Sequence, residues 1–477
     1  MQHDENHEAA LLRFVFPQVY RYYRERDASR WWRGLRGFAQ RARLLWFCLR
    51  KLPAWQRARR IGAGTVLPLP PTAAGRNLYF IATLNQRDAL LPVLARDPQG
   101  LLVSTRAELK PAVRLHWDRM WDYSYRWLPR LFELALHGDG PELLLAARLP
   151  KRVLGAFALD ALLREHLLPA LRPACVVMSN DHNLDHRCLI RACRAAGVPS
   201  LYLQHAAVTG RFPPLAFDVA LLDGRDSLEK YRGAGASRTQ VALVGVAKFA
   251  GTQARVNRRA QVVRVGICIS WSTPAEAAYA LVGALRGWFP QLELFVRPHP
   301  RRAADSVTAL QAYGAAHGVG ISVPARENSI QFLTHMDLII AGNSSVLLDA
   351  ALLNVVPVYC PLTDGPAMHR HKPLPDYCAT CDYEHQKPDM YGFRATDWCR
   401  DAPTLDALRA QVAAVLNSRP DVRAQARAFC ETIGTPWDFR SDALAAECIA
   451  AVAARKPWPV DKIDLATAGA MPDAPRA

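Results

Sequence analysis

The chain has 477 residues, of which 50% are hydrophobic and 22% are charged, a composition typical of globular and not of disordered proteins. This length exceeds one ordinary core, so two α/β domains with appendages are expected. The formal charge of +17 is concentrated near the N-terminus, because residues 1–60 hold fourteen Lys and Arg and only five acidic residues. Any surface for an anionic partner is therefore expected in this segment.

The sequence predicts neither a signal peptide nor a transmembrane helix. Its start is polar and acidic, and no run of about 20 apolar residues occurs anywhere. The eleven cysteines are scattered and odd in number, which favours reduced thiols over a disulfide framework. We therefore predict a cytoplasmic protein, either free or peripheral at the inner face of the cytoplasmic membrane.

Residues 1–70 are predicted to form a basic, aromatic, helical appendage. Apolar residues recur at helical spacing at Trp31, Leu35, Phe38, Ala42, Leu45, Trp46 and Leu49, and basic residues on the other side are Arg33, Arg36, Arg43 and Lys51. Such a helix could lie on an anionic membrane through residues 10–62, or it could pack on the domain with its arginines solvated. Nucleic acid is not an expected partner, because no recognisable binding module accompanies the charge.

After a Pro-rich joint near Leu67 to Pro71, strands and helices alternate in a first Rossmann-like domain, residues 71–250. Its predicted strands are Leu78 to Ala82, Leu101 to Ser104, Cys175 to Met178, Ser200 to Leu203 and Val219 to Leu222. A polar linker, 250–261, precedes a second Rossmann-like domain, 262–440. Its predicted strands are Val262 to Ile269, Leu292 to Val296, 320–323, Leu338 to Ala341 and the apolar segment before Tyr359. Residues 441–477 are expected to form a closing helix and a loose tail.

A strand–turn–helix unit around residue 343 is the most informative motif. The strand Leu338 to Ala341 ends at Gly342, a residue that permits close approach of the backbone to a ligand. Asn343, Ser344 and Ser345 follow at the mouth of a helix, where hydroxyls and unpaired N–H groups suit a phosphate oxygen. Asp349, one turn further on, could meet a sugar hydroxyl. The alternatives are that the serines are helix caps and that Asp349 is a solvated charge.

A second polar strand end carries Arg297 and His299, the latter held between two prolines that stiffen its backbone. Together these two side chains could neutralise a phosphate leaving group, as transfer from a nucleotide donor requires. The alternative is a turn histidine bonded to backbone. If both strand ends belong to one parallel sheet, they imply one nucleotide-sized site.

Three consecutive strands of the first domain also end in polar groups: Asp181, His205 and Asp223. A histidine of near-neutral pKa could deprotonate an acceptor hydroxyl. Asp181 could orient His205 or act as the base itself, and Asp223 is a further candidate for the base. Each of the three could instead serve only in turn formation.

No metal site is predicted. Cys378-x-x-Cys381, with His385 and Cys399 downstream, lacks the tight ligand spacing of a zinc site, which stays a weaker alternative. Walker A, GxGxxG, HExxH and GxSxG motifs are absent from the sequence.

The chain resembles GT-B glycosyltransferases, in particular the bacterial branch of polysialyltransferases, capsule Kdo transferases and CDP-glycerol glycerophosphotransferases. The matching residues are RPHP at 297–300, NSSVLLD at 343–349 and QH at 204–205. The resemblance implies two Rossmann-like parallel-sheet domains facing across a cleft. It also implies that His299, Ser344 and Ser345 hold donor phosphate, that Asp349 meets the donor sugar and that His205 activates the acceptor. The sequence departs from the pattern at Ala206, where glycine is usual.

The predicted function is transfer of a sugar from a nucleotide-activated donor, CMP- or UDP-linked, to a surface polysaccharide or lipid-linked glycan. No other cofactor is implied by the resemblance. Two alternatives are a glycerophosphotransferase using CDP-glycerol on the same fold and a non-catalytic scaffold at the membrane.

Overall fold

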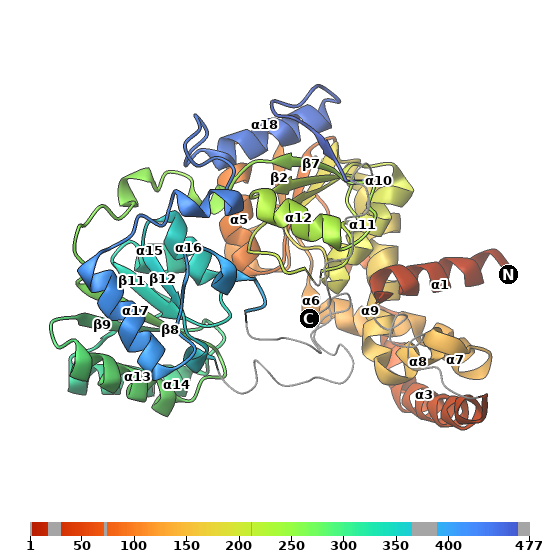
Figure 1. Ribbon diagram of the computed structural model, residues 1–477. Coiled ribbons are helices and arrows are strands. Elements are labelled where there is room, and N and C mark those ends of the chain that lie inside the picture. The colour runs from red at the N-terminus through yellow and green to blue at the C-terminus, as the bar shows by residue number, and fades with distance from the viewer. Residues whose placement is uncertain (1, 18–29, 71–73, 211, 365–388, 466–477) are drawn as a thin grey trace.

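The computed structural model describes residues 2–17, 30–70, 74–210, 212–364 and 389–465. Its strands form two separate sheets, sheet A with eight strands and sheet B with six, which lie in different lobes (Figure 1). Every strand pair is parallel except the pairing of β14 with β7. The prediction of two parallel-sheet α/β domains is therefore confirmed.

Sheet A contains, in spatial order, β14 (Ile463–Asp464), β7 (Gln240–Leu243), β6 (Val219–Leu222), β5 (Ser200–Leu203), β4 (Cys175–Met178), β1 (Asn77–Ile81), β2 (Gly100–Ser104) and β3 (Val113–Arg114). The five strands expected from the sequence are all present. β3, β7 and β14 were not expected. β14 lies within the segment expected to be a loose tail, and its two residues are too few to show a periodic pattern.

Helices cover both faces of sheet A, because alternate residues of each strand point to opposite sides. Leu78 and Phe80 of β1 belong to the core shared with α9 (Pro150–Ala161) and α11 (Leu184–Ala196). Tyr79 and Ile81 of the same strand face the other side, toward α5 (Leu84–Leu94) and α18 (Ser441–Ala453). α18, which follows the second domain in the sequence, thus returns to the first domain.

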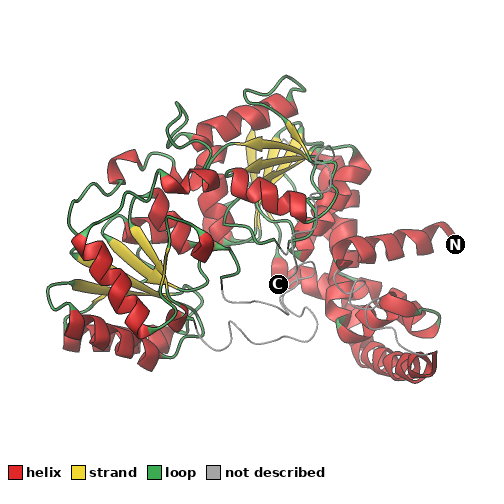
Figure 2. Ribbon diagram, viewed as in Figure 1, coloured by secondary structure: helices red, strands yellow, loops and turns green. Residues whose placement is uncertain are grey.

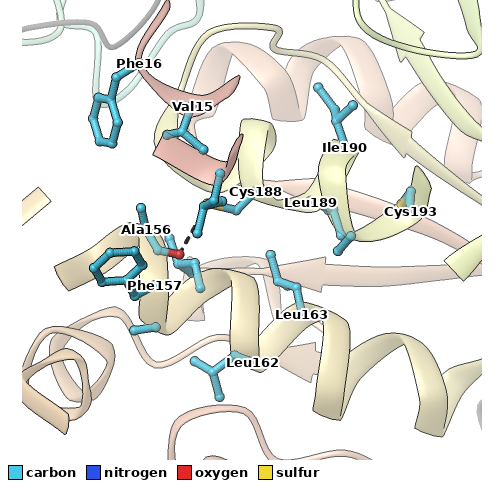
Figure 3. Packing of buried hydrophobic residues seen from close by; sticks show 14 of the residues in the cluster. Val15, Phe16, Ala156, Phe157, Leu162, Leu163, Cys188, Leu189, Ile190 and Cys193 are labelled. Carbon is cyan, nitrogen blue, oxygen red and sulfur yellow. Dashed lines mark hydrogen bonds between the residues drawn. The ribbon is translucent and has the colours of Figure 1, made fainter. Parts of the chain in front are cut away.

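The N-terminal helices pack on this domain. At the end of α1 (Gln2–Val15), Val15 and the following Phe16 lie among side chains of α9 and α11 (Figure 3). α3 (Arg30–Ala58) packs against α6 (Trp117–Ser124), α7 (Leu128–Leu136) and α8 (Gly140–Arg148). Figure 2 shows this outer part of the lobe as helical. Leu44 and Cys48 of α3 are buried on this packed face.

Sheet B contains, in order, β10 (Gly320–Ile321), β9 (Glu293–Pro298), β8 (Arg264–Ile269), β11 (Leu338–Ala341), β12 (Val356–Tyr359) and β13 (Arg400–Asp401). The helices of this domain are α13 (Ala275–Trp288), α14 (Ala304–His317), α15 (Ser329–Leu333), α16 (Val346–Leu352) and α17 (Leu405–Asn417). The remaining α-helices of the described ranges are α4 (Ala63–Val66), α10 (Leu168–Leu171) and α12 (Arg225–Gly233).

None of the helices in the described ranges is both long and apolar enough to cross a membrane. The nine cysteines that the structure describes are all free thiols.

Candidate functional site

The carboxyl ends of β9, β8 and β11 lie level at one edge of sheet B. Cys268 of β8 is paired with Arg297 on one side and with Ala341 on the other. Parallel strands leave a sheet on the same edge, so the turns that begin at His299 and at Gly342 emerge together, on either side of the turn after β8. Two strand spacings separate them, about 10 Å. This distance suits groups that bind different parts of one nucleotide.

The turn after β8, residues 270–273, lies between the two predicted motifs. The hydroxyl of Ser270 is 2.9 Å from that of Thr273, and the indole of Trp271 is 42% exposed. Arg302 donates from Nη1 to the carbonyl of Ser270 over 3.3 Å, which ties the β9 end to the β8 end. No function was predicted for this turn from the sequence. The rule that ligands bind at carboxyl ends of strands could have found it.

His299 has a defined tautomer. Its Nδ1 accepts a hydrogen bond from the backbone N–H of Arg301 over 3.0 Å, so a neutral ring carries its proton on Nε2. Burial, together with the charges of Arg301 and Arg297, lowers the pKa of His299 to about 4. At neutral pH the ring is therefore an uncharged donor, suited to a phosphate oxygen.

Arg297 is only 7% exposed and its guanidinium is engaged by protein groups. Nη1 donates to the hydroxyl of Ser322, and Nη2 donates to the carbonyl of Glu327 over 2.9 Å. These bonds fix the segment between β10 and α15 against β9. The predicted neutralisation of phosphate by Arg297 would require these bonds to be exchanged.

Gly342 and Asn343 hold the neighbouring loop. A Cβ at Gly342 would lie 2.3 Å from the carboxyl carbon of Asp364, so glycine makes room for this side chain, where the sequence suggested a ligand. The N–H of Asn343 donates to the same carboxylate, and its side-chain oxygen accepts from the N–H of Met390 over 2.9 Å. Asn343, predicted to bind the donor, thus has contacts that position the loop.

The two serines differ in what they already bind. Ser344 Oγ accepts a 3.3 Å hydrogen bond from the N–H of Val346, as a capping residue would. Ser345 occupies the N-cap position of α16, but its side chain makes no capping bond. Both are partly exposed at the sheet edge. Helix capping therefore accounts for Ser344, while the hydroxyl of Ser345 remains able to bind a ligand.

Asp349 connects the two domains. Its carboxylate lies 2.6 Å from Nζ of Lys248, and both side chains are nearly buried. Lys248 lies in the 3-10 turn η4 (Ala247–Phe249) that follows β7 of sheet A. The predicted contact of Asp349 with a donor sugar would have to compete with this ion pair. Lys248 was missed because a single lysine after a strand has no motif.

The strands that precede Asp181, His205 and Asp223 are neighbours in sheet A. β4 pairs with β5 and β5 pairs with β6, all parallel, so the three residues follow strands that end at one edge. Burial, with the positive charges of His182 and Lys248, lowers the pKa of His205 to about 3. The ring is thus neutral at neutral pH, and its buried Nδ1 has no hydrogen-bond partner among the described residues.

Asp181 is occupied by neighbours of its own. Its carboxylate accepts hydrogen bonds from His182 Nδ1 over 2.6 Å and from the hydroxyl of Tyr231 over 3.1 Å. Burial alone would raise the pKa of Asp181, but these contacts lower it. It orients His182 directly, where the sequence left open that it would orient His205.

Asp223 is also buried, but its pKa is shifted in the direction opposite to that of Asp181. Its backbone N–H donates to Gln204 Oε1 over 3.0 Å, but its carboxyl group receives no hydrogen bond from the part of the chain that the structure describes. Burial raises the pKa of Asp223 well above its usual value; Lys248 opposes this and Asp349 adds to it. This buried carboxyl group, with its raised pKa, lies beside the interdomain ion pair of Lys248 and Asp349.

Replacing Asp223 with Asn should stabilise the protein increasingly as the pH rises. Because the folded-state pKa is raised, the stability that the neutral carboxyl contributes is complete below the unfolded value of 3.8 and is lost as the pH rises through the folded pKa. Asn cannot ionise, so the difference in Tm between D223N and wild type should be more positive at about pH 8 than at about pH 5. An Asp305→Asn control on the exposed side of α14 should show no such trend. A D223N protein that loses stability at the higher pH would show instead that Lys248 stabilises an ionised Asp223.

A pocket of about 600 Å³ opens beside this edge of sheet A. Trp117 and Trp121 of α6, at 5.6 Å between ring centroids, form part of its wall. Arg106, Arg114 and Arg152 add positive charge, and His182 and Asn183 after β4 complete the side toward the strand ends. Glu108 and Asp185 also line the pocket, and Arg106 forms an ion pair with Glu108, so the wall carries both charges. Indole rings beside such polar groups suit a sugar.

No group of three or more metal-ligating side chains occurs in the described ranges. Cys378, Cys381 and His385 lie outside those ranges, and Cys399 is buried next to β13.

Comparison with known proteins gives structural neighbours alone: no family model and no curated protein matches the chain. One neighbour is a putative UDP-N-acetylglucosamine 2-epimerase from Listeria monocytogenes, with 11% identity and a TM-score of 0.49, covering 82% of this chain and 99% of the epimerase. The wall teichoic acid polymerase TagF has 8% identity and a TM-score of 0.47, with 87% and 98% of the two chains covered. MurG from Acinetobacter baumannii has 14% identity and a TM-score of 0.42, with 79% and 99% covered. The chain is similar to these proteins along nearly their whole length.

Proposed function

We propose that the chain is a glycosyltransferase that uses a nucleotide-activated sugar. The observation that carries this proposal is the ion pair between Lys248 and Asp349. It joins a turn that follows sheet A to the helix that begins at the serine pair of sheet B. A donor bound at one edge would therefore lie next to an acceptor bound at the other.

The donor would bind at the carboxyl edge of sheet B. Nε2 of His299 and the hydroxyl of Ser345 would donate hydrogen bonds to its phosphate oxygens, and the cationic Arg302 lies on the same turn. The exposed ring of Trp271 could stack on the nucleobase. Negative charge that develops on the leaving nucleotide would be stabilised by donors already in position.

The acceptor would enter through the pocket of Trp117 and Trp121, and its hydroxyl would transfer a proton to His205. The pKa of about 3 makes His205 a weak base in the free protein. A bound anionic donor would place negative charge nearby and raise that pKa, so the base would strengthen when the donor is present. Lys248 would help to balance the negative charges of Asp349 and the donor.

Thermal unfolding in the presence of CMP, CDP, UDP and GDP tests donor binding and identifies the nucleobase that the site prefers. A nucleotide at about a hundred times its Kd should stabilise the folded chain by about 2.7 kcal/mol. The proposal expects at least one of the four to raise the Tm, and the corresponding sugar conjugate to be consumed when a glycan acceptor is added. Absence of any shift would support the non-catalytic scaffold. Products linked by phosphodiester bonds would identify a glycerophosphotransferase.

A further inference from the structure

One face of α3 is apolar, exposed and free of any described contact that would explain it. Phe38 is 75% exposed, Trp46 is 60% exposed and Leu49 is 55% exposed. With the exposed Ala42 they follow spacings of three and four residues, which place them in one stripe along the helix. Large apolar side chains gathered in this way usually mark an interaction surface.

The stripe is not needed to hold α3 in place. Leu44, Cys48 and Ala58 are buried on the opposite face, where the helix packs on α7 and α8. The helix is thus anchored to the first domain through one side and presents the other outward. α3 lies at the periphery of its lobe (Figure 1).

Positive charge accompanies the stripe. Arg43, Arg50 and Arg57, each seven residues from the next, are exposed in a row beside it and form no ion pair with residues that the structure describes. The guanidinium of Arg50 lies 4.5 Å from the ring centroid of Trp46. α3 contains eight Lys and Arg and no acidic residue, and none occurs in the sequence between Asp27 and Asp88.

We propose that this face of α3 binds an anionic lipid bilayer, with the stripe inserted at the headgroup level and the arginines on the lipid phosphates. An apolar stripe with tryptophan beside a basic row is the chemistry of helices that lie in a membrane interface. Each arginine near an anionic surface contributes about 1 kcal/mol. A nucleic acid would use the arginines but leave the stripe in water. Two copies of the helix would repel each other through their uniform positive charge.

The position of α3 links the membrane-binding face to the proposed acceptor pocket, a link that rests on the proposed function. α3 packs against α6, which carries Trp117 and Trp121 of the acceptor pocket. The helix that would bind the bilayer is therefore in direct contact with a helix that lines the proposed acceptor pocket.

Co-sedimentation of the full-length chain with vesicles of phosphatidylcholine, with and without phosphatidylglycerol, tests the binding without any assay of activity. We expect binding to the anionic vesicles and weak binding to the neutral ones. R43Q/R50Q/R57Q should weaken binding about a hundredfold, which corresponds to about 3 kcal/mol. W46S/L49S should weaken it to a similar degree, because the apolar insertion is lost. NaCl at about 1 M, where the Debye length is about 3 Å, should weaken wild-type binding.

Two controls alter exposed residues of the same kinds elsewhere in the chain. R255Q/R258Q/R326Q removes three exposed arginines from the second domain, and L405S removes an exposed leucine from α17. Both controls should bind vesicles as wild type does, and all variants should keep the wild-type Tm.

Equal binding to neutral and anionic vesicles, loss of binding in the controls, or no binding by wild type would overturn the proposal. Retained vesicle binding by R43Q/R50Q/R57Q with lost binding to duplex DNA would assign the arginines to nucleic acid. If the chain bound anionic vesicles but none of the nucleotides, the proposed function would be wrong, and the assignment of this face of α3 to membrane binding would stand.

Discussion

Replacement of His205 with Gln should lower the transfer rate about 100- to 10,000-fold, the contribution typical of a general base. Gln retains a polar side chain of similar size but cannot take up a proton. The buried Nδ1 of His205 has no partner in the described chain, so the substitution breaks no hydrogen bond of that atom. Nucleotide binding, measured by thermal shift, should be unchanged. Retention of more than a tenth of the wild-type rate would instead assign the proton transfer to another group, with Asp223 the first candidate.

The pH dependence of the wild-type reaction tests the role of His205 independently. A base must be unprotonated, and the pKa of His205 in the free chain is about 3, so kcat/KM should not fall between about pH 8 and about pH 5 because of this group. In the complex with an anionic donor the pKa should be higher, so the acid limb of kcat should lie at higher pH than that of kcat/KM. The same acid limb in H205Q would show that it arises from another group. His317, exposed on α14, provides a matched H317Q control that should leave both profiles unchanged.

Replacement of His299 with Ala should weaken nucleotide binding about 10- to 100-fold and lower turnover with it, because a hydrogen bond to a charged phosphate is worth about 1.5–3 kcal/mol. Ala removes two things at once: the Nε2 donor and the Nδ1 acceptor for the N–H of Arg301. His299→Asn separates them, because an asparagine oxygen can accept from the N–H two residues on. H299N should therefore keep the turn and the wild-type Tm but bind nucleotide as weakly as H299A.

Two different results with these variants would contradict the assignment of His299 to the donor site. Full nucleotide binding by H299A would show that the ring does not contact the donor. Weak binding by H299A with full binding by H299N would show that the ring acts through the turn alone. If His205 and His299 have the roles proposed, H205Q loses turnover and keeps binding, whereas H299N loses both.

The local units of this protein could be predicted from its sequence. The apolar runs that end at Gly342 and before His299 are strands in the structure, and their register places both motifs at one edge. The same holds for the strands that precede Asp181, His205 and Asp223. Such units depend on side-chain period and turn residues within a few positions, information that is local to the chain.

The partners of the polar side chains could not be predicted in this way. Arg297 was expected to face phosphate, but its guanidinium binds Ser322 and Glu327. Gly342 was expected to admit a ligand, but it admits the carboxylate of Asp364. Each of these contacts joins segments about 20 or more residues apart, and no periodic pattern specifies which polar group comes to lie opposite which.

The sequence by itself determined two parallel-sheet domains, a basic helical N-terminal segment and a set of polar residues at strand ends, because hydrophobic period, turn chemistry and charge are written residue by residue. The tertiary structure alone decided that Lys248 meets Asp349 across the domains, that burial raises the pKa of Asp223 and that α3 turns Trp46 outward. These outcomes depend on how whole elements pack against one another. Packing selects one face of each helix and one partner for each charge from several that the sequence permits.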